Sequence, residues 1–330
     1  MITVKKKIGI PKYKQIINSI EDAIISGTLQ KGDQIPSINS IKDEHSLSRD
    51  TVLTAFNELK NRGIIHSVVG KGYYVSSENV NVTQKIFLLF DELNSFKEDL
   101  YNSFLEHLGE NIQVDIFFHH FNENLFSKLI FDNAGDYNYY AIMPANLKNT
   151  NNAIQNLPQE KVYILDQIHD DLLNYSAIYQ NFEKAIFNNL TKSLHLIKKY
   201  KKLILVFSED KQPQGMLKGF TIFCKKNSIP FTVLNSLQDH TLEKGELYII
   251  PDDKSLLRII KKMKSNAFIL TKDIGIISYN DTLLKEIVEG GITTISTDFN
   301  MMGKRLAEMI LNKEVIKIEN PNNLIIRNSL

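Results

Sequence analysis

The sequence predicts an α/β protein made of a small, mainly helical N-terminal unit and a much larger unit with parallel sheets. Two observations lead to this prediction. Residues 35–75 contain two short amphipathic stretches, followed by a Gly-Lys-Gly turn between β-rich segments. After residue 84, short apolar runs alternate with helical stretches, which is typical of parallel strands covered on both faces. The length of 330 residues suits two or three units.

Two helices are predicted between residues 36 and 62. Ser37 and Ser48 are plausible N-caps of the first and the second helix. One face of the second helix is apolar at three- and four-residue spacing, through Val52, Phe56 and Leu59. The opposite face offers polar side chains to a partner, namely Arg49, Thr51, Thr54 and Lys60.

The segment that follows is expected to form a two-stranded wing whose turn is the Gly-Lys-Gly of residues 70–72. This turn is not a phosphate-binding loop, because its spacing is wrong and no helix follows it. A helix-turn-helix with a wing places its second helix in the major groove of DNA. The N-terminal unit is therefore predicted to bind double-stranded DNA.

The same segment resembles the GntR family of bacterial transcription regulators. The resemblance rests on six short motifs in the family's order: residues 11–13 (Pro-Lys-Tyr), 27–32 (Gly-Thr-Leu-Gln-Lys-Gly), 35–37 (Ile-Pro-Ser), 48–52 (Ser-Arg-Asp-Thr-Val), 59–65 and 70–75. One position departs from the pattern. Asn39 stands where the family usually carries an arginine, so a hydrogen-bonding group remains but its charge is lost.

With the resemblance, these residues acquire expected roles on DNA. Arg49 is the candidate for direct base readout, by bidentate contact with a guanine. Lys71 and Gly72 are expected at the wing tip, close to the minor groove. The remaining candidates are hydrogen-bonding side chains expected to contact the DNA backbone or, for the asparagine, an adenine edge: Tyr13, Ser37, Asn39, Ser48 and Thr51.

Charge is unevenly distributed along the chain. Residues 1–76 carry eleven Lys or Arg against seven Asp or Glu, whereas the remainder carries twenty-eight against thirty-one. A basic N-terminal unit on an acidic body fits a regulator that contacts phosphates at one end. The lysines at positions 5–7 are expected to form a disordered arm beside DNA.

The expected location is the cytoplasm. Cys224 is the single cysteine, which excludes an internal disulfide and fits a reducing compartment; its setting indicates a buried, inert thiol. No apolar stretch has the length of a signal peptide or of a membrane span. We expect no membrane partner.

Residues 77–84 are polar and aperiodic, so a linker is predicted between a DNA-binding unit at 1–76 and a body at 85–330. Strands in the body are expected at residues 86–90, 114–118, 140–143, 162–165, 203–207, 231–234, 247–250, 267–270 and 274–278. Helices are expected near residues 96–108, 182–199, 215–227, 254–263, 283–289 and 302–311. This number of strands suits two parallel sheets.

The body resembles the effector domain of the LacI/GalR regulators, which is akin to periplasmic sugar-binding proteins. The motifs are at residues 274–282, 292–299, 302–307 and 325–329. The resemblance implies two α/β lobes around a sugar-binding cleft and pairing as a homodimer. A GntR reader joined to such a body is the arrangement of arabinose-type repressors.

Polar residues that follow the strands are the candidate effector contacts, because ligands of open α/β sheets bind at the carboxyl ends of the strands. They are Asp91, Glu92, Asp166, Gln180, Asn181, Asp252, Asp253, Asn280 and Asp281, with Phe96, Tyr279 and Phe299 as apolar faces. Met216 stands where the resemblance places a sugar-clamping arginine, so the pocket departs from the family and a phosphorylated ligand is disfavoured. The alternative reading is that these acids and amides cap the following helices, which we favour for Asp281.

The sequence therefore predicts a repressor of a carbohydrate-utilisation operon that leaves its operator when it binds a pentose or deoxyhexose. A regulator that senses a non-sugar metabolite, or that acts as an activator, remains an alternative. No enzyme activity and no cofactor are expected, since no catalytic constellation and no cofactor-binding lysine are visible. A metal site at His119 and His120 is disfavoured because adjacent residues of a strand point to opposite faces; residues 169–171 (His-Asp-Asp) are the other weak candidate.

Overall fold

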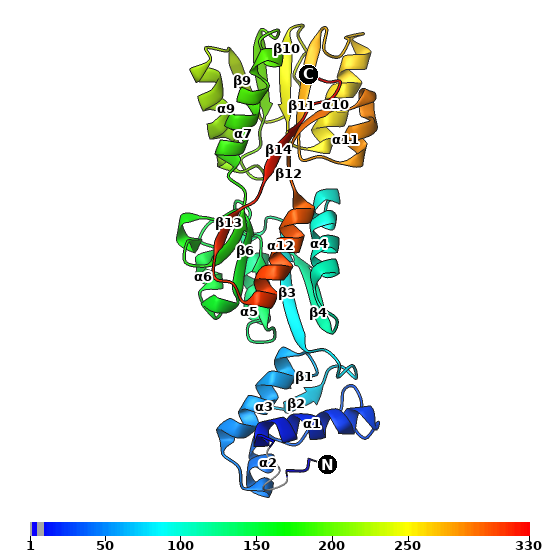
Figure 1. Ribbon diagram of the computed structural model, residues 1–330, viewed down its shortest axis with the longest axis vertical. Helices are drawn as coiled ribbons and strands as arrows, with labels where there is room; N and C mark the ends of the chain where they lie inside the picture. Colours follow the sequence, from blue (N-terminus) through cyan, green and yellow to red (C-terminus); the bar gives the residue numbers. More distant parts are fainter. Residues whose placement is uncertain (1, 5–9) are drawn as a thin grey trace.

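The computed structural model describes residues 2–4 and 10–330. They form three successive bodies along one long axis (Figure 1). We call the described residues up to 76 the reader. Lobe 1 comprises residues 84–179 and 299–319, and lobe 2 comprises residues 182–297 and 322–330. The lysines at positions 5–7, for which an arm beside DNA is expected, lie outside the described residues.

The reader consists of α1 (Lys12–Ile25), α2 (Ile38–His45), α3 (Arg49–Asn61) and a hairpin of β1 (Ile65–Val68) and β2 (Gly72–Val75). Val52, Phe56 and Leu59 of α3 are fully buried in its core, as the periodicity predicts. Ser37 and Ser48 cap α2 and α3 through their hydroxyl oxygens. The structure thus confirms the helix-turn-helix with a wing.

Lobe 1 is built on a parallel six-stranded sheet in the order β13-β7-β6-β5-β3-β4. Its strands are β3 (Gln84–Phe90), β4 (Ile112–Phe118), β5 (Tyr139–Ile142), β6 (Val162–Asp166), β7 (Ser176–Tyr179) and β13 (Lys317–Glu319). Helices α4 (Ser95–His107), α5 (Glu123–Asp132), α6 (Asn151–Ile154) and α12 (Phe299–Asn312) accompany it. Apolar clusters cover both faces, as the apolar runs predict.

Lobe 2 has a second six-stranded sheet in the order β14-β12-β11-β10-β8-β9, parallel except for the edge strand β14. Its strands are β8 (Lys202–Val206), β9 (Phe231–Leu234), β10 (Glu246–Ile250), β11 (Ile274–Tyr279), β12 (Thr293–Thr297) and β14 (Asn322–Ile325). Its helices are α7 (Phe182–Lys192), α8 (Leu194–Ile197), α9 (Gln214–Lys226), α10 (Asp253–Ser265) and α11 (Leu283–Ile287).

The chain passes between the lobes after β7, after β12 and between β13 and β14 (Figure 1). Each lobe also has one helix pair that crosses at a glycine. A Cβ on Gly303 of α12 would lie 2.3 Å from the carbonyl oxygen of Leu100 in α4. A Cβ on Gly219 of α9 would lie 2.3 Å from the carbonyl oxygen of Glu183 in α7. Both pairs therefore pack at a distance that only glycine allows.

Two expectations about elements are wrong. Residues 267–270 form no strand; the chain turns at once into β11, with the Ile269 N–H bound to the Asp273 carboxylate at 2.8 Å. The single helix expected at 182–199 is divided, because the Ser193 hydroxyl donates to the carbonyls of Asn189 and Leu190 at 2.9 and 3.2 Å. Across the described ranges, no helix combines the length and apolar character needed to cross a membrane.

Candidate nucleic-acid interface and ligand cavity

The first turn of α3 presents the candidate base-reading residue. Arg49 is exposed there. The Ser48 oxygen accepts a hydrogen bond from the Thr51 N–H at 3.2 Å, and the two hydroxyls lie 2.7 Å apart. A helix N-terminus with hydroxyl groups attracts phosphate. The first turn of α3 therefore presents hydroxyl groups and an exposed guanidinium group close together.

The other helical candidates lie on α1 and α2. The Ser37 oxygen accepts from the Ser40 N–H at 3.1 Å, and Asn39 is exposed in the first turn of α2. The ring of Tyr13, in the first turn of α1, packs against the reader core. Each of these side chains thus lies near a helix start, as the sequence predicts for contacts with DNA.

The wing tip is held in place by a neighbouring segment. Lys71 is exposed in the turn, and its carbonyl accepts from the Gln34 side-chain amide at 2.7 Å. Gly72 has φ of 117°, which an L-residue rarely adopts, and a Cβ there would lie 3.1 Å from the same amide. Gly72 is therefore required by the turn itself, independently of any approach to DNA.

The C-terminal end of α3 faces lobe 1. The Lys60 ammonium pairs with the Asp136 carboxylate at 2.7 Å, so the expectation that Lys60 faces a partner is wrong. The Arg62 guanidinium donates to the carbonyls of Val82 and Val80 at 2.7 and 2.8 Å. These bonds fasten residues 77–84 to the reader. Such a contact is not visible in the sequence, because its partners are backbone carbonyls.

A cavity of about 480 Å³ lies between the two lobes. Eleven of the thirteen residues that the sequence proposes as effector contacts line it, and nine of them are Asp91, Glu92, Phe96, Asp166, Gln180, Met216, Asp252, Asn280 and Phe299. Asp253 and Tyr279 line it as well. Asn181 does not; its side chain caps α7 by accepting from the Lys184 N–H at 3.1 Å.

Lobe 1 contributes a compensated charge cluster to the cavity wall. Lys97 of α4 is 5% exposed and pairs with the Asp91 carboxylate. Burial lowers the pKa of Lys97 to about 8, although the nearby Asp166 carboxylate opposes this shift. Burial raises the pKa of Asp166, against Lys97 and a 2.5 Å hydrogen bond from the Gln180 amide. Lys97 is not among the residues predicted from the sequence, because a lysine in an amphipathic helix is usually solvated.

Lobe 2 contributes the loops after β10 and β11. Asp252 both lines the cavity and caps α10 by accepting from the Ser255 N–H at 2.8 Å. Asn280 has φ of 58°, and its side-chain oxygen is buried with no hydrogen-bond partner among the described residues. A buried amide oxygen without a donor is costly, so a ligand hydroxyl would satisfy it.

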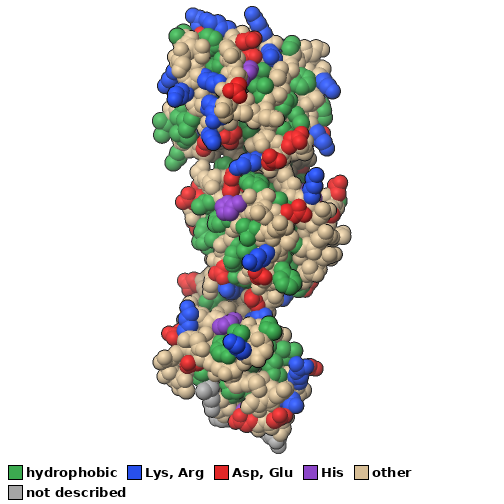
Figure 2. Space-filling model, turned by 180° about the vertical axis from the view of Figure 1, so that it is seen from behind, with side chains coloured by type: hydrophobic (Ala, Val, Ile, Leu, Met, Phe, Trp, Pro, Cys, Tyr) green, Lys and Arg blue, Asp and Glu red, His purple; other side chains and the backbone are tan. Residues whose placement is uncertain are grey.

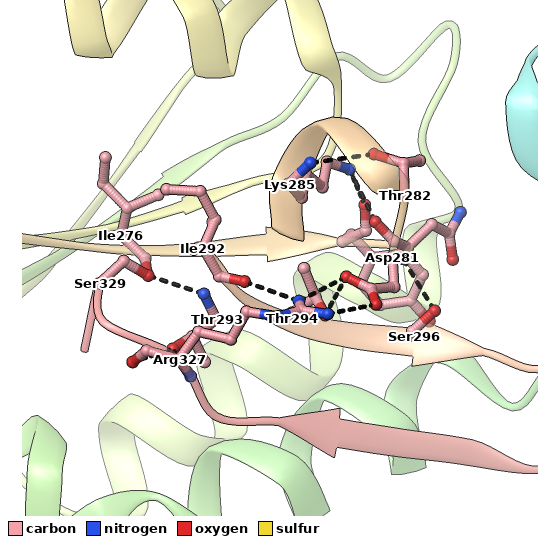
Figure 3. Close-up of polar contacts among 12 residues, drawn as sticks. Ile276, Asp281, Thr282, Lys285, Ile292, Thr293, Thr294, Ser296, Arg327 and Ser329 are labelled. Carbon is pink, nitrogen blue, oxygen red and sulfur yellow. Dashed lines mark hydrogen bonds and ion pairs between the residues drawn. The ribbon is translucent and has the colours of Figure 1, made fainter. Parts of the chain in front are cut away.

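Asp281 does not cap the following helix, contrary to expectation. Thr282 is the N-cap of α11, and both Asp281 carboxylate oxygens accept from the Arg327 guanidinium, at 2.6 and 2.7 Å (Figure 3). Arg327 holds the pKa of Asp281 below its usual value, against the effect of burial. The partner lies 46 residues away on the chain, beyond the reach of local cap rules.

Contacts across the cavity join the lobes. Lys211 of lobe 2 pairs with Glu92 of lobe 1 at 3.2 Å and lies 5.2 Å from the Phe121 ring centroid. The Asn146 amide donates to the Gln212 carbonyl at 2.6 Å. Figure 2 shows charged side chains of both signs near the waist between the lobes. Polar contacts of this kind can open and re-form as the lobes move.

Two of the three histidine candidates for a metal, His119 and His169, lie within hydrogen-bond distance of backbone carbonyls. The His119 ring nitrogen Nε2 lies 3.0 Å from the Met143 carbonyl, and burial lowers the pKa of His119 to about 4. His169 Nε2 lies 2.7 Å from the Ala145 carbonyl. Cys224 is buried in α9, where burial raises the pKa of its thiol to about 12. The two histidines therefore contact backbone carbonyls, and the thiol is buried in the fold.

Known proteins resemble the two parts separately. The profile of the family described as "Bacterial regulatory proteins, gntR family" matches residues 12–75. The HTH-type transcriptional repressor YtrA of Bacillus subtilis is 31% identical over 100 residues, which are 30% of this chain and 73% of YtrA. The mannosyl-D-glycerate transport/metabolism system repressor MngR of Escherichia coli is 36% identical over 107 residues, 32% of this chain and 41% of MngR. The arabinose metabolism transcriptional repressor of Geobacillus stearothermophilus is 37% identical over 71 residues, 22% of this chain and 20% of that repressor.

The body is similar to solved LacI family regulators. One from Silicibacter pomeroyi has a TM-score of 0.63 at 14% identity, covering 74% of this chain and 98% of the other. One from Enterococcus faecium with bound ribose has a TM-score of 0.60 at 16% identity, with 74% and 98% covered. These likenesses confirm the two-lobed fold expected of the body. With its winged helix and its match to YtrA, the chain belongs to the gntR family of bacterial regulatory proteins.

Proposed function

We propose that the protein represses a carbohydrate-utilisation operon and leaves its operator when a neutral monosaccharide, such as a pentose or deoxyhexose, binds between its lobes. The observation that carries this proposal is the compensation of charge around the cavity. Asp91 pairs with Lys97, Glu92 with Lys211 and Asp253 with Lys285. Three of the five carboxylates that line the cavity are thus paired with a lysine, and this compensation favours a ligand without net charge.

The polar groups left for a ligand suit hydroxyls. Asp166 keeps carboxylate acceptor positions beside its bond to Gln180, and the Asn280 amide oxygen has no hydrogen-bond partner in the part of the chain that the structure describes. Phe96 and Phe299 lie with their ring centroids 4.8 Å apart on the wall and offer an apolar surface. Such a mixture is typical of small-molecule pockets. The relatives MngR and the arabinose repressor carry names from sugar metabolism, and the Enterococcus faecium neighbour holds ribose.

Release from DNA would follow from lobe movement. Asp166 ends β6 in lobe 1 and Asn280 follows β11 in lobe 2, so a ligand that contacts both favours a closed arrangement. In a two-fold dimer, closure would change the spacing of the two readers. Because linkage is reciprocal, a sugar that weakens operator binding must itself bind less tightly when operator is present.

The DNA part of the proposal is tested with two variants. Arg49→Ala should weaken binding to the operator by about 1–3 kcal/mol and relax preference at one base pair, whereas Lys71→Ala should weaken specific and random DNA alike. Titration of fluorescent duplexes at several salt concentrations measures both effects. Equal loss on operator and random DNA for Arg49→Ala would show that Arg49 does not read bases.

The ligand part is tested on the full chain by a thermal-shift screen of pentoses and deoxyhexoses, followed by calorimetry with the sugar that stabilises most. A ligand at 100 times its dissociation constant adds about 2.7 kcal/mol to stability. Asp166→Ala and Asn280→Ala should each lower the affinity for the sugar. Operator DNA should lower the affinity of the wild-type protein for the sugar. Unchanged affinity in both variants would refute the site, and unchanged affinity with operator would refute the coupling.

A further inference from the structure

We propose that Lys285 is a positioning residue that holds Asn280 in the backbone conformation in which it meets the ligand. The proposal deepens the proposed function, because it assumes that the cavity between the lobes binds a sugar. Lys285 does not line the cavity. It would act entirely through the two loops that do, those after β10 and β11.

The Lys285 ammonium is fully enclosed and fully bonded. The residue is 1% exposed. Its Nζ donates to the carbonyls of Tyr279 and Asn280, both at 2.7 Å, and pairs with the Asp253 carboxylate at 3.0 Å. These three acceptors match the three N–H donors of an ammonium group. Lys285 therefore joins the end of β11 to the first turn of α10.

Asn280 needs such support because its backbone is in the left-handed region, with φ of 58°. Asparagine adopts this conformation more readily than most residues other than glycine, and neighbouring groups determine whether it persists. The Asn280 N–H is bound to the Ile295 carbonyl at 2.8 Å. On the other side, the successive carbonyls of Tyr279 and Asn280 converge on one point, and the ammonium there offsets their mutual repulsion.

The residue after Asn280 is fixed by a separate set of bonds. The Asp281 N–H donates to the Ser296 hydroxyl at 2.8 Å, and the carboxylate accepts from Arg327 and, at 2.9 Å, from the Thr294 hydroxyl (Figure 3). This network ties the loop to β12 and to the chain after β14. Lys285 holds the loop from the α10 side, and it is the side chain that bonds Asn280 itself.

A purely stabilising role does not account for a buried cation at this position. Burial lowers the pKa of Lys285, against the attraction of Asp253. Replacing both members of a buried ion pair together by well-packed apolar side chains is often neutral for stability, so stability alone does not require a buried lysine and its carboxylate partner. The helix does not need the ammonium either, since the Thr282 side chain caps α11. An apolar side chain has no N–H donors, so it could not hold the carbonyls of Tyr279 and Asn280 at one point.

The consequence concerns the shape of the lobe 2 wall. Asp253 and Asn280 both line the cavity, and they follow β10 and β11, which are neighbours in the sheet. Since Lys285 bonds both residues, it sets their spacing and the direction of the Asn280 amide. The buried amide oxygen of Asn280, which has no partner among the described residues, is thereby kept in place for a ligand hydroxyl.

The experiment is a double-mutant cycle on the full chain with Lys285→Met, Asn280→Ala and both together. Calorimetry uses the pentose or deoxyhexose that gives the largest thermal shift in wild type. If Lys285 acts through Asn280, Lys285→Met should lower the affinity for the sugar about tenfold in the wild-type background. In the Asn280→Ala background it should lower the affinity less than about twofold. Equal loss in both backgrounds would overturn the proposal. The matched control Lys261→Met removes an exposed lysine of lobe 2 and should leave affinity unchanged.

A second readout needs no ligand. Hydrogen exchange by NMR should show faster exchange at the amides of Asn280 and Asp281 in Lys285→Met, and at neither in Lys261→Met. Unchanged exchange would overturn the proposal even if no sugar binds. If Asn280→Ala leaves sugar affinity intact while exchange changes as expected, the proposed ligand contact fails and the positioning role stands. Should Lys285→Met not fold, Lys285→Gln, which keeps two N–H donors without charge, allows the same measurements.

Discussion

The two lobes each bury a lysine near the carboxyl ends of their strands, but the surroundings of the two ammonium groups differ. Lys97 in lobe 1 faces the cavity, with the carboxylates of Asp91 and Asp166 near it. Lys285 in lobe 2 faces the protein, with two backbone carbonyls and Asp253 as its partners. One lysine belongs to a charge cluster at the ligand surface, and the other to the scaffold behind it.

This difference separates two ways of building a cavity wall. In lobe 1, a ligand or a change of pH acts directly on charges that already compensate one another. In lobe 2, beside the carboxylates of Asp252 and Asp253, the ligand would meet the neutral amide of Asn280, whose position depends on bonds that the ligand does not contact. We therefore expect lobe 1 to determine how affinity depends on charge and pH, and lobe 2 to determine the geometry of the site.

The largest effect is expected when the buried pair of lobe 1 is broken. Asp91→Ala leaves Lys97 buried without its closest carboxylate, which should lower the free energy of unfolding by about 3–5 kcal/mol. The control is Glu92→Ala, which removes an exposed pair with Lys211 and should cost no more than about 1 kcal/mol. Urea unfolding followed by circular dichroism measures both. Similar losses of unfolding free energy in the two variants would show that the Lys97 ammonium reaches solvent when its carboxylate partner is removed.

A smaller effect should be shared by the two lobes. Gly303→Ala and Gly219→Ala each place a Cβ against a carbonyl of the partner helix, so each should cost about 1–3 kcal/mol through forced displacement of that helix. Gly109→Ala, where nothing lies within 4 Å of the added Cβ, should stay within about 0.5 kcal/mol of wild type. A cost in only one lobe would mean that the other helix pair can adjust.

The smallest effect is a pH dependence from Lys97. Its pKa is about 8 in the folded protein against 10.5 for an ordinary lysine. Between these values the unfolded chain binds more protons, so stability should rise with pH, by up to about 1.4 kcal/mol from pH 8 to pH 9. The difference in unfolding free energy between wild type and Lys97→Met, measured at pH 7, 8, 9 and 10, isolates this contribution. Parallel pH curves would contradict a lowered pKa.

Local patterns predicted the reader well. The caps at Ser37 and Ser48 and the buried face of α3 were evident because each depends on residues within one or two turns. The strand-end rule placed seven of its nine effector candidates around the cavity, since parallel strands bring their carboxyl ends to one edge whatever the sequence between them. The prediction for Asn181 is wrong because its side chain caps α7, the helix that follows it.

What the sequence determined by itself is the order of the parts: a winged helix-turn-helix, then two parallel sheets whose strand ends carry acids and amides. Periodicity, caps and turn residues are local, so they can be read along the chain. Only the tertiary structure decided which charges meet. Lys60 forms an ion pair with Asp136, and Arg327 forms one with Asp281. Arg62 donates hydrogen bonds to carbonyls of the linker. These partners are distant along the chain or are backbone atoms, and only the packing of the folded chain brings them within hydrogen-bond distance.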